Sequence, residues 1–379
     1  MERNIVHMDM DTFFVSVERL RDRSLIGKPV LVGGNSDRAV VASCSYEARQ
    51  FGVHSAMPMR LAQRLCPDAV IRKGDYDEYS KYSKLVTDIL IEKAPLVEKA
   101  SIDEFYLDLS GMDRFFGCWK WSLELRKKVI RETGLSISMG LSPNKTVSKI
   151  TTGQAKPAGS LEVGHGMERA FLAPLPANKI PGIGPETYKM LCKMGASHIY
   201  HLQALQPELM EATFGKAGIM IYSKANGLDE SPVIPYQEQK SVSRSITFER
   251  DTTDMNILHK TIIGFVDELG FELRSQQRLT GCVTITIRYA DWNTYSRQSQ
   301  IPYSSTDDVL VKTALQLFEK LYDRRMLVRL VGVKFSDFVS GSYQIDLFSD
   351  SVGKINLYQA IDGIKKRFGP ELLKKAACL

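Results

Sequence analysis

The chain has few cysteines, and they do not form a metal-binding or disulfide pattern. The six cysteines stand far apart, at positions 44, 66, 118, 192, 282 and 378, without a CxxC pair. Structural zinc sites and disulfide-rich secreted domains both use closely spaced cysteines. The sequence therefore argues against both classes and predicts reduced thiols in a cytosolic protein.

Long apolar runs, low-complexity tracts and internal repeats are also missing. The first apolar stretch follows an acidic residue, Glu2, and is broken by aspartate, unlike a signal peptide. No apolar run is long enough for a membrane-spanning helix. We therefore expect a cytoplasmic protein that does not associate with membranes.

The composition is that of an ordinary globular protein with a small basic excess. The chain has 379 residues, of which 44% are hydrophobic and 25% charged, and its net charge is +6. This length allows roughly two to four domains, each with its own core. The basic excess favours a polyanionic partner, although many basic proteins bind no nucleic acid.

Strands and helices alternate in the first part of the chain. The pattern predicts a buried strand over residues 5–9, and Asp11 is expected to cap a helix from Thr12 to about Leu20. The segment LVEKASIDEFYLDLSG predicts a hairpin. Other strand or helix patterns occur in GKPVLVGG, RAVVASCSYEARQFG, YSKYSKLVTDILIEKA and GLSISMGLSPNKTVSKITTGQAKPAG. Together they predict an α+β fold around one sheet.

The composition changes near residue 170. The residues from there to about 228 look wholly helical, and GLDESPVIPYQEQK is a proline-bearing polar linker. Strands with two amphipathic helices between them are expected after the linker. In CVTITIRY, apolar side chains alternate with Thr284, Thr286 and Arg288. One face of this second sheet is therefore expected to be polar and open to solvent or a partner.

Three carboxylates stand at predicted strand ends. Asp9 ends the first strand, and Asp103 and Glu104 are adjacent within the predicted hairpin. Adjacent side chains of a regular strand point to opposite faces, so both face one site only at a bend or hairpin tip. Such a cluster of oxygen ligands suits magnesium or manganese, and two such ions can catalyse phosphoryl transfer.

Two other interpretations of these carboxylates remain open. Each motif alone is more often a set of turn and cap residues. DMDT also resembles the DxDxT pattern of phosphatases that form an aspartyl-phosphate, but its threonine is one position too early and position 13 is phenylalanine.

Basic and hydroxyl side chains capable of holding phosphate occur in two further motifs. Tyr46 and Arg49 are three residues apart, on one face of a predicted helix. Lys145, Lys149 and Lys156 lie in the segment that precedes and includes a proline turn. Taken singly, each is more simply a solvated side chain.

The segment IPGIGPET has the pattern of a helix-hairpin-helix DNA-binding unit. Gly182 and Gly184 flank Ile183, and Pro185 stands at a predicted helix start. Successive backbone amides at a helix N-terminus bind phosphate without reading sequence. The alternative is a simple helix–helix turn.

Taken together, these motifs resemble the Y-family DNA polymerases, in particular their bacterial DNA polymerase IV branch. The resemblance covers about residues 4 to 340 and rests on HMDMDTFFVSVE, YEARQFGVHSAMPM, SIDEFYLDLS, GLSPNKTVSKITTGQAKPAG and IPGIGPETYKML, in the family's order. It implies a right-hand polymerase. The implied parts are a palm (1–18 and 77–166), fingers (19–76), a helical thumb (167–230), a linker (231–240), a little finger (241–340) and a tail (341–379).

The resemblance also implies roles for individual residues. Asp9 and Asp103 would bridge two Mg²⁺ ions, with Mn²⁺ possible, while Glu104 and the carbonyl of Met10 complete the two metal sites. Phe14 would be the steric gate that excludes a ribose 2′-hydroxyl; from the residues alone it is a core side chain. The remaining implied nucleotide-binding residues are Phe13, Ser43, Tyr46, Arg49 and Lys156, and the implied DNA-binding residues are Gly182, Ile183, Gly184, Arg244 and Ser245.

Some positions depart from the commonest family pattern. Val15 and Phe105 stand where alanine is usual, and Ser148 and Thr152 replace smaller residues. None of these changes removes a ligand. They bear on nucleotide and lesion preference and leave the expected reaction unchanged.

The segment QIDLF after the last expected strand resembles the bacterial sliding-clamp peptide. Gln344 and the pair Leu347 and Phe348 are its anchors, and such side chains fill an apolar pocket on a partner. The alternative is that Leu347 and Phe348 pack onto the little finger. Downstream, INLYQAIDGIKKRFG looks like an amphipathic helix.

The resulting prediction is a template-directed, low-fidelity translesion DNA polymerase. Its expected partners are primer–template DNA, dNTPs and a sliding clamp, and a monomer is expected. No proofreading exonuclease segment is recognisable. Two rival functions remain, a metal-dependent phosphohydrolase or nuclease and a non-catalytic DNA-binding protein.

Overall fold

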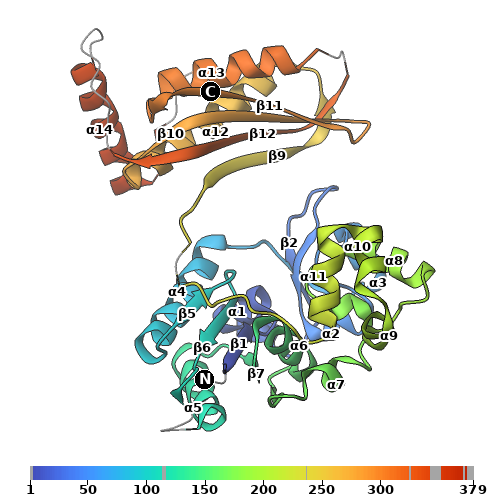
Figure 1. Ribbon diagram of the computed structural model, residues 1–379. Helices are drawn as coiled ribbons and strands as arrows, with labels where there is room; N and C mark the ends of the chain where they lie inside the picture. Colours follow the sequence, from blue (N-terminus) through green and yellow to red (C-terminus); the bar gives the residue numbers. More distant parts are fainter. Residues whose placement is uncertain are drawn as a thin grey trace. The chain divides into compact units, whose positions relative to one another are not determined.

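The computed structural model describes residues 3–112, 117–235, 237–323, 326–341, 351–369 and 372–373. It divides the chain into two compact units, Met1–Gln237 and Glu238–Leu379. Unit 1 holds two sheets and a helical region, and unit 2 holds one sheet with its helices (Figure 1). No helix in the described part of the chain is long and apolar enough to cross a membrane.

The larger sheet of unit 1 has five strands in the order β5-β6-β1-β7-β8. These strands are β1 (Ile5–Met10), β5 (Val97–Lys99), β6 (Glu104–Asp108), β7 (Ile137–Ser142) and β8 (Ser160–Glu162). The central strand β1 pairs antiparallel with both β6 and β7. β5 and β6 form the antiparallel hairpin that the sequence predicts.

One face of this sheet carries the main core of unit 1. It packs against α1 (Phe13–Arg21), α4 (Tyr76–Lys93) and α5 (Cys118–Thr133). Apolar side chains such as Val15, Leu90 and Val129 meet strand residues such as Met8 and Phe105 there. Phe105 is fully buried in this core, which accounts for the large residue that replaces the usual alanine.

α6 (Lys145–Ala155) packs closely against β7 and β1. A Cβ added at Gly140 of β7 would lie 2.5 Å from the carbonyl oxygen of Ser148, so only glycine fits there. Thr152 fills the space above β1, where its hydroxyl donates to the backbone oxygen of His7 at 3.0 Å. Ser148 and Thr152 are therefore buried packing residues on the inner side of α6.

A smaller three-stranded sheet, in the order β3-β2-β4, forms a separate core. It consists of β2 (Val30–Gly33), β3 (Val41–Cys44) and β4 (Val70–Arg72), accompanied by η1 (Arg23–Leu25), α2 (Tyr46–Arg49) and α3 (Met59–Leu65). Its residues fall within the range expected for fingers.

The helical region after β8 also has its own core, to which α6 contributes Val147 and Ile150. Its elements are α7 (Glu168–Leu172), η3 (Ala177–Lys179), α8 (Pro185–Lys193), α9 (Ile199–Ala204), α10 (Pro207–Phe214) and α11 (Lys216–Ala225). The chain then returns to the larger sheet. Asp229 accepts from the backbone N–H of Thr146 at 3.0 Å, and the backbone N–H of Ile234 donates to Glu98 at 2.7 Å. These hydrogen bonds attach the first half of the expected linker to unit 1.

Unit 2 is a four-stranded antiparallel sheet in the order β11-β10-β12-β9. Its elements are β9 (Ser241–Thr252), α12 (Met255–Ser275), β10 (Arg278–Tyr289), β11 (Thr294–Ser304), α13 (Asp307–Leu321), β12 (Val328–Ser340) and α14 (Ser351–Phe368). Val283, Ile285 and Ile287 of β10 face the core, as the alternation predicts. On the other face, Thr286 and Arg288 bond to Ser296 and Thr294 of β11.

α14 packs onto unit 2 through a buried ionic network. The guanidinium of Arg274, whose side chain is 3% exposed, lies 2.8 Å from Asp362 of α14 and 2.6 Å from Asp307. Lys365 of α14 pairs with Asp267 at 2.6 Å. The helix expected in the tail is thus present, and these ion pairs attach it to unit 2.

The described cysteines are free thiols. Cys44, Cys66, Cys118 and Cys282 are buried, and Cys192 is exposed. The expectation of reduced thiols holds for these five.

Candidate active site

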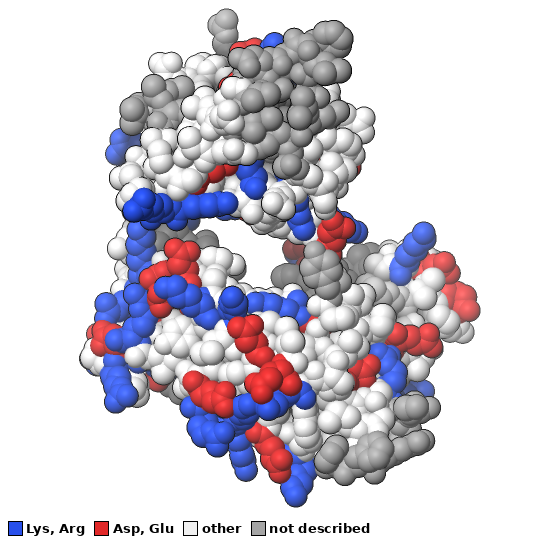
Figure 2. All heavy atoms as spheres, turned by 90° about the vertical axis from the view of Figure 1, so that its left-hand side faces the viewer, with Lys and Arg blue, Asp and Glu red and all other residues white. Residues whose placement is uncertain are grey.

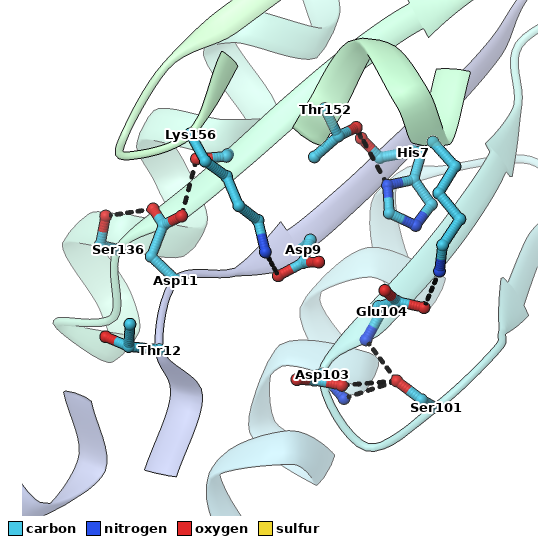
Figure 3. A network of polar contacts seen from close by, with 12 residues as sticks. His7, Asp9, Asp11, Thr12, Ser101, Asp103, Glu104, Ser136, Thr152 and Lys156 are labelled. Atoms are coloured by element: carbon cyan, nitrogen blue, oxygen red, sulfur yellow. Dashed lines mark hydrogen bonds and ion pairs between the residues drawn. The ribbon is translucent and has the colours of Figure 1, made fainter. Parts of the chain in front are cut away.

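The expected carboxylates lie together where β1 ends and β6 begins (Figure 3). Asp9 stands directly opposite Glu104 in the antiparallel register of β1 and β6. Opposite residues of an antiparallel pair place their side chains on the same face. Asp103 lies in the bend just before β6, and its backbone oxygen accepts from the N–H of Met10 at 3.0 Å.

Ser101 stabilises this bend. Its hydroxyl donates to the carboxylate of Asp103 at 2.5 Å and accepts from the backbone N–H groups of Asp103 and Glu104 at 3.2 and 3.0 Å. The bend is the condition under which two adjacent carboxylates can serve one site, and the structure meets it.

A cavity of about 130 Å³ extends from the end of β1 to the nucleotide-binding candidates. Its lining contains most of the residues expected at the site, but neither Glu104 nor Tyr46. The lining residues are Asp9, Met10, Thr12, Phe13, Phe14, Ala42, Ser43, Arg49, Ser55, Asp103 and Lys156.

Two lysines neutralise two of the three carboxylates. Nζ of Lys156 lies 2.5 Å from Asp9, and Nζ of Lys149 lies 2.5 Å from Glu104. Lys145, the third basic candidate in this segment, instead pairs with Glu98 at 2.7 Å. Lys145 also lies over the ring of Tyr106 at 4.6 Å and does not line the cavity.

The donor set fits a hard divalent cation, although the side chains are not arranged around one. Among the residues that the structure describes, no group of three or more His, Cys, Asp or Glu side chains could hold a metal ion as it stands. Burial raises the pKa of Asp9 to about 7, with Lys156 acting against this rise and Glu104 and Asp103 adding to it. These oxygen ligands would favour magnesium or manganese once the two lysines move aside, because a cation would then offset both the burial of Asp9 and its repulsion from Glu104 and Asp103.

The small sheet presents the phosphate-binding candidates on α2. Ser45 caps this helix by accepting from the N–H of Ala48, and Tyr46 and Arg49 follow on one face. The guanidinium of Arg49 lies 5.2 Å from the centre of the Tyr46 ring. Burial, and then the nearby Asp11 carboxylate, raise the pKa of Tyr46, so its phenol stays a hydrogen-bond donor.

The expected steric gate has a rigid support. The ring of Phe14 stacks on Tyr79 of α4, with centroids 4.2 Å apart and an interplanar angle of 12°. The Tyr79 hydroxyl donates to Glu18 at 2.8 Å. Phe13 is 3% exposed and belongs mainly to the core, while Phe14 is partly buried and also lines the cavity.

The predicted cap at Asp11 is wrong. α1 begins at Phe13, and its N-terminal cap is Thr12, in the left-handed conformation and without a side-chain cap bond. Asp11 is instead 2% exposed and accepts from Tyr46, Ser136, Ser138 and Ala158. No local pattern marks this role, because its donors lie 35 to 147 positions away.

The glycine hairpin precedes α8 as expected. Gly182 has φ 103°, a conformation that favours glycine, and Gly184 is the N-cap of α8 with Pro185 in its first turn. Ile183 is 8% exposed and packs into the helical core. A second cavity, of about 250 Å³, lies between this hairpin and α6 and is lined by Lys149 and Gly182 among others.

The remaining candidates lie outside unit 1 or outside the described residues. Arg244 and Ser245 are exposed on β9, where Arg244 lies 3.3 Å from Glu272. Gln344, Leu347 and Phe348 fall in residues 342–350, which the structure does not describe.

Comparisons with known proteins show the family of the chain. The model of the impB/mucB/samB family matches residues 8–153, and that of its C-terminal domain matches residues 239–347. A protein called DNA polymerase IV from Dehalococcoides mccartyi is 36% identical over 97% of this chain and 95% of its own. Proteins with the same name from Desulfatibacillum aliphaticivorans and Treponema denticola are 36% and 34% identical over 99% and 100% of the chain, and 97% of their own.

A solved structure shares the fold. It is a Y-family DNA polymerase chimera, with a TM-score of 0.79 and 24% identity, and the match covers 89% of this chain and all of the other. The predicted right-hand polymerase fold is therefore confirmed. The chain belongs to the impB/mucB/samB family, within the Y-family DNA polymerases that include the DNA polymerase IV proteins.

Proposed function

We propose that the cavity beside Asp9 and Asp103 is the site where this chain adds dNTPs to a primer. As a member of its family, the chain is a DNA-directed DNA polymerase of the low-fidelity, translesion type that acts on primer–template DNA. One observation carries the location of the site. The same cavity is lined by Asp9 at the end of β1 and Asp103 just before β6, by Phe14, and by the basic side chains of Arg49 and Lys156.

The reaction is a nucleotidyl transfer. The primer 3′-oxygen attacks the α-phosphorus of the dNTP, the bond to the β-phosphate oxygen breaks, and pyrophosphate leaves. Asp9, Asp103, Glu104 and the carbonyl of Met10 would hold two Mg²⁺ or Mn²⁺ ions. When bound, these ions lower the pKa of the attacking hydroxyl and stabilise charge on the phosphorus oxygens.

The chain's own residues bind and orient the nucleotide. Lys156 would leave Asp9 and bind the triphosphate, because the phosphate is the stronger partner once cations neutralise the Asp9 carboxylate. Arg49 and the neutral hydroxyl of Tyr46 donate to other phosphate oxygens. Phe14, held by Tyr79, closes the space that a ribose 2′-hydroxyl needs, and Phe13 and Ser43 shape the adjoining wall.

Binding to primer–template DNA would be mainly a matter of phosphate contacts. Gly182, Ile183 and Gly184 offer backbone amides at the start of α8, and Arg244 and Ser245 lie exposed on β9. Lysine and arginine side chains occur on both units in the face drawn in Figure 2, mixed with acidic ones on unit 1. The affinity should therefore fall steeply as salt is raised.

The metal requirement gives the test of the proposed site. A chelator should stop extension of a labelled primer, and added magnesium should restore it, since the carboxylates alone cannot activate the 3′-hydroxyl. The matched control is primer–template binding measured in the same chelator. This binding should persist. Extension that continues at the same rate without divalent cations would remove the two-metal proposal.

We also propose that Gln344, Leu347 and Phe348 bind a sliding clamp and that the chain works as a monomer in the cytoplasm. The support for clamp binding is the peptide pattern alone. Replacing Leu347 and Phe348 with alanine should abolish stimulation by the clamp and leave clamp-free extension within about twofold, because the anchors fill the partner's pocket. Equal stimulation of parent and variant would assign both residues to packing.

A further inference from the structure

The buried carboxylate of Asp11 joins parts of unit 1 that are distant in sequence. Its Oδ1 accepts from the Tyr46 hydroxyl at 3.2 Å and the Ser138 hydroxyl at 2.8 Å. Its Oδ2 accepts from the Ser136 hydroxyl at 2.7 Å and the backbone N–H of Ala158 at 3.0 Å. A carboxylate that is 2% exposed is costly unless its oxygens are satisfied, and here both are. Figure 3 shows Asp11 bonded to Ser136.

Two side chains of opposite charge hold the turn that follows Lys156. Asp11 accepts from the N–H of Ala158, and the guanidinium of Arg126 on α5 donates to its carbonyl oxygen. Arg126 also donates to the backbone oxygen of Ile137 at 2.6 Å, which ties the turn to β7. Ala158 has φ 52°, a conformation that residues other than glycine rarely adopt. These bonds therefore stabilise a backbone conformation that is otherwise unfavourable.

We propose that Asp11 is a positioning residue that sets the places of Tyr46 and Lys156, with Arg126 as its partner on the turn. The proposal rests on the proposed function of these two residues in triphosphate binding. The Asp11 carboxylate accepts from the Tyr46 hydroxyl on α2. It also accepts from the turn that follows Lys156 at the end of α6. It therefore fixes, before the nucleotide arrives, the separation of two phosphate-binding groups, one on α2 and one at the end of α6.

Asp11 binds Tyr46 through one oxygen and Ala158 through the other, so mutations can separate these two contacts. In Asp11→Asn, one oxygen becomes an amide nitrogen, which cannot accept. The backbone N–H of Ala158 cannot turn away, whereas a hydroxyl can, so the remaining oxygen should face Ala158. Tyr46 then loses its charged acceptor, and its hydroxyl can bond to this side chain only by accepting from the amide. Arg126→Gln has the complementary effect, since it releases the carbonyl side of the turn and leaves the bond to Tyr46 in place.

The test is steady-state insertion of one dNTP on a primed template by both variants and the parent. Asp11→Asn should raise KM for the dNTP about tenfold with little change in kcat. This rise should vanish in a Tyr46→Phe background, where the hydroxyl is already gone. Arg126→Gln should raise KM for the dNTP about fivefold, both alone and in the Tyr46→Phe background. It should cause no further rise when Lys156→Met is already present. Arg131→Gln, on the exposed side of the same helix, is the matched control and should match the parent.

The thermal midpoint and the primer–template Kd are measured on every variant. A merely structural role would lower the midpoint or the DNA affinity and would give the same loss in every background, and that result overturns the proposal. An unchanged KM in both variants overturns it as well. If Asp11→Asn does not fold, the test rests on the KM values of Arg126→Gln in the Tyr46→Phe and Lys156→Met backgrounds. A parent that inserts no nucleotide would overturn the proposed function itself, which is a different outcome.

Discussion

The Glu104→Gln variant is expected to extend primers about 1000-fold more slowly than the parent. The register places Glu104 opposite Asp9, and a neutral amide in its place removes one of the carboxylates that would hold the cations. The loss of several kcal/mol of transition-state stabilisation corresponds to a rate effect of this size. The measurement is the rate of single-nucleotide insertion at saturating dNTP and magnesium.

Glu124→Gln supplies the matched control for this variant. Glu124 lies exposed on α5 and loses the same charge, so its rate should equal the parent's. Primer–template binding by Glu104→Gln should remain, since the residues proposed to bind DNA, in the hairpin before α8 and on β9, are unchanged. A rate within tenfold of the parent would show that Glu104 is not a catalytic residue.

The second large effect is expected at the steric gate. Phe14→Ala should lower the preference for dNTPs over rNTPs about 100-fold, because removing the ring opens room for the 2′-hydroxyl. In the parent this ring cannot easily swing aside, since it stacks at 4.2 Å on Tyr79, which is itself buried and bonded to Glu18. The measurement is the ratio of kcat/KM for a matched dNTP and rNTP pair.

Tyr79→Phe tests the support without removing the gate. It keeps the stacked ring and loses only the bond to Glu18, so the dNTP preference should stay within about threefold of the parent. An unchanged preference in Phe14→Ala would contradict the gate assignment and return Phe14 to a core role.

Local pattern predicted the elements on which the site is built. The apolar alternation located β1, and the acidic pair located the start of β6, because side-chain period and turn chemistry are properties of short segments. The alternation in CVTITIRY likewise predicted which face of the unit 2 sheet is buried. The glycines of IPGIGPET marked the turn before α8 because Gly182 requires a positive φ.

The partners of polar side chains could not be predicted in this way. Asp11 looked like a helix cap because its neighbours in sequence are the start of a helix, but its four donors come from three distant segments. Lys145 and Lys149 have the same local context, yet one binds Glu98 and the other Glu104. Which carboxylate a lysine meets is decided by how the sheet and α6 pack.

The C-terminal helix shows the same limit on a larger scale. Its amphipathic pattern predicted a helix but not its place. Arg274 and Asp267 of α12, on which α14 packs, precede their partners on α14 by 88 and 98 positions. A buried charge needs a partner of opposite sign, so these pairs fix how the helix lies on unit 2.

The most direct test of the proposed function offers one dNTP at a time to a labelled primer on a template of known next base, with magnesium. The complementary dNTP should lengthen the primer by one nucleotide much faster than the other three, and Glu104→Gln should give no product on that timescale. A shortened primer without any dNTP would instead indicate a nuclease. Binding of the primer–template with no change in primer length would contradict the polymerase account and leave a DNA-binding protein.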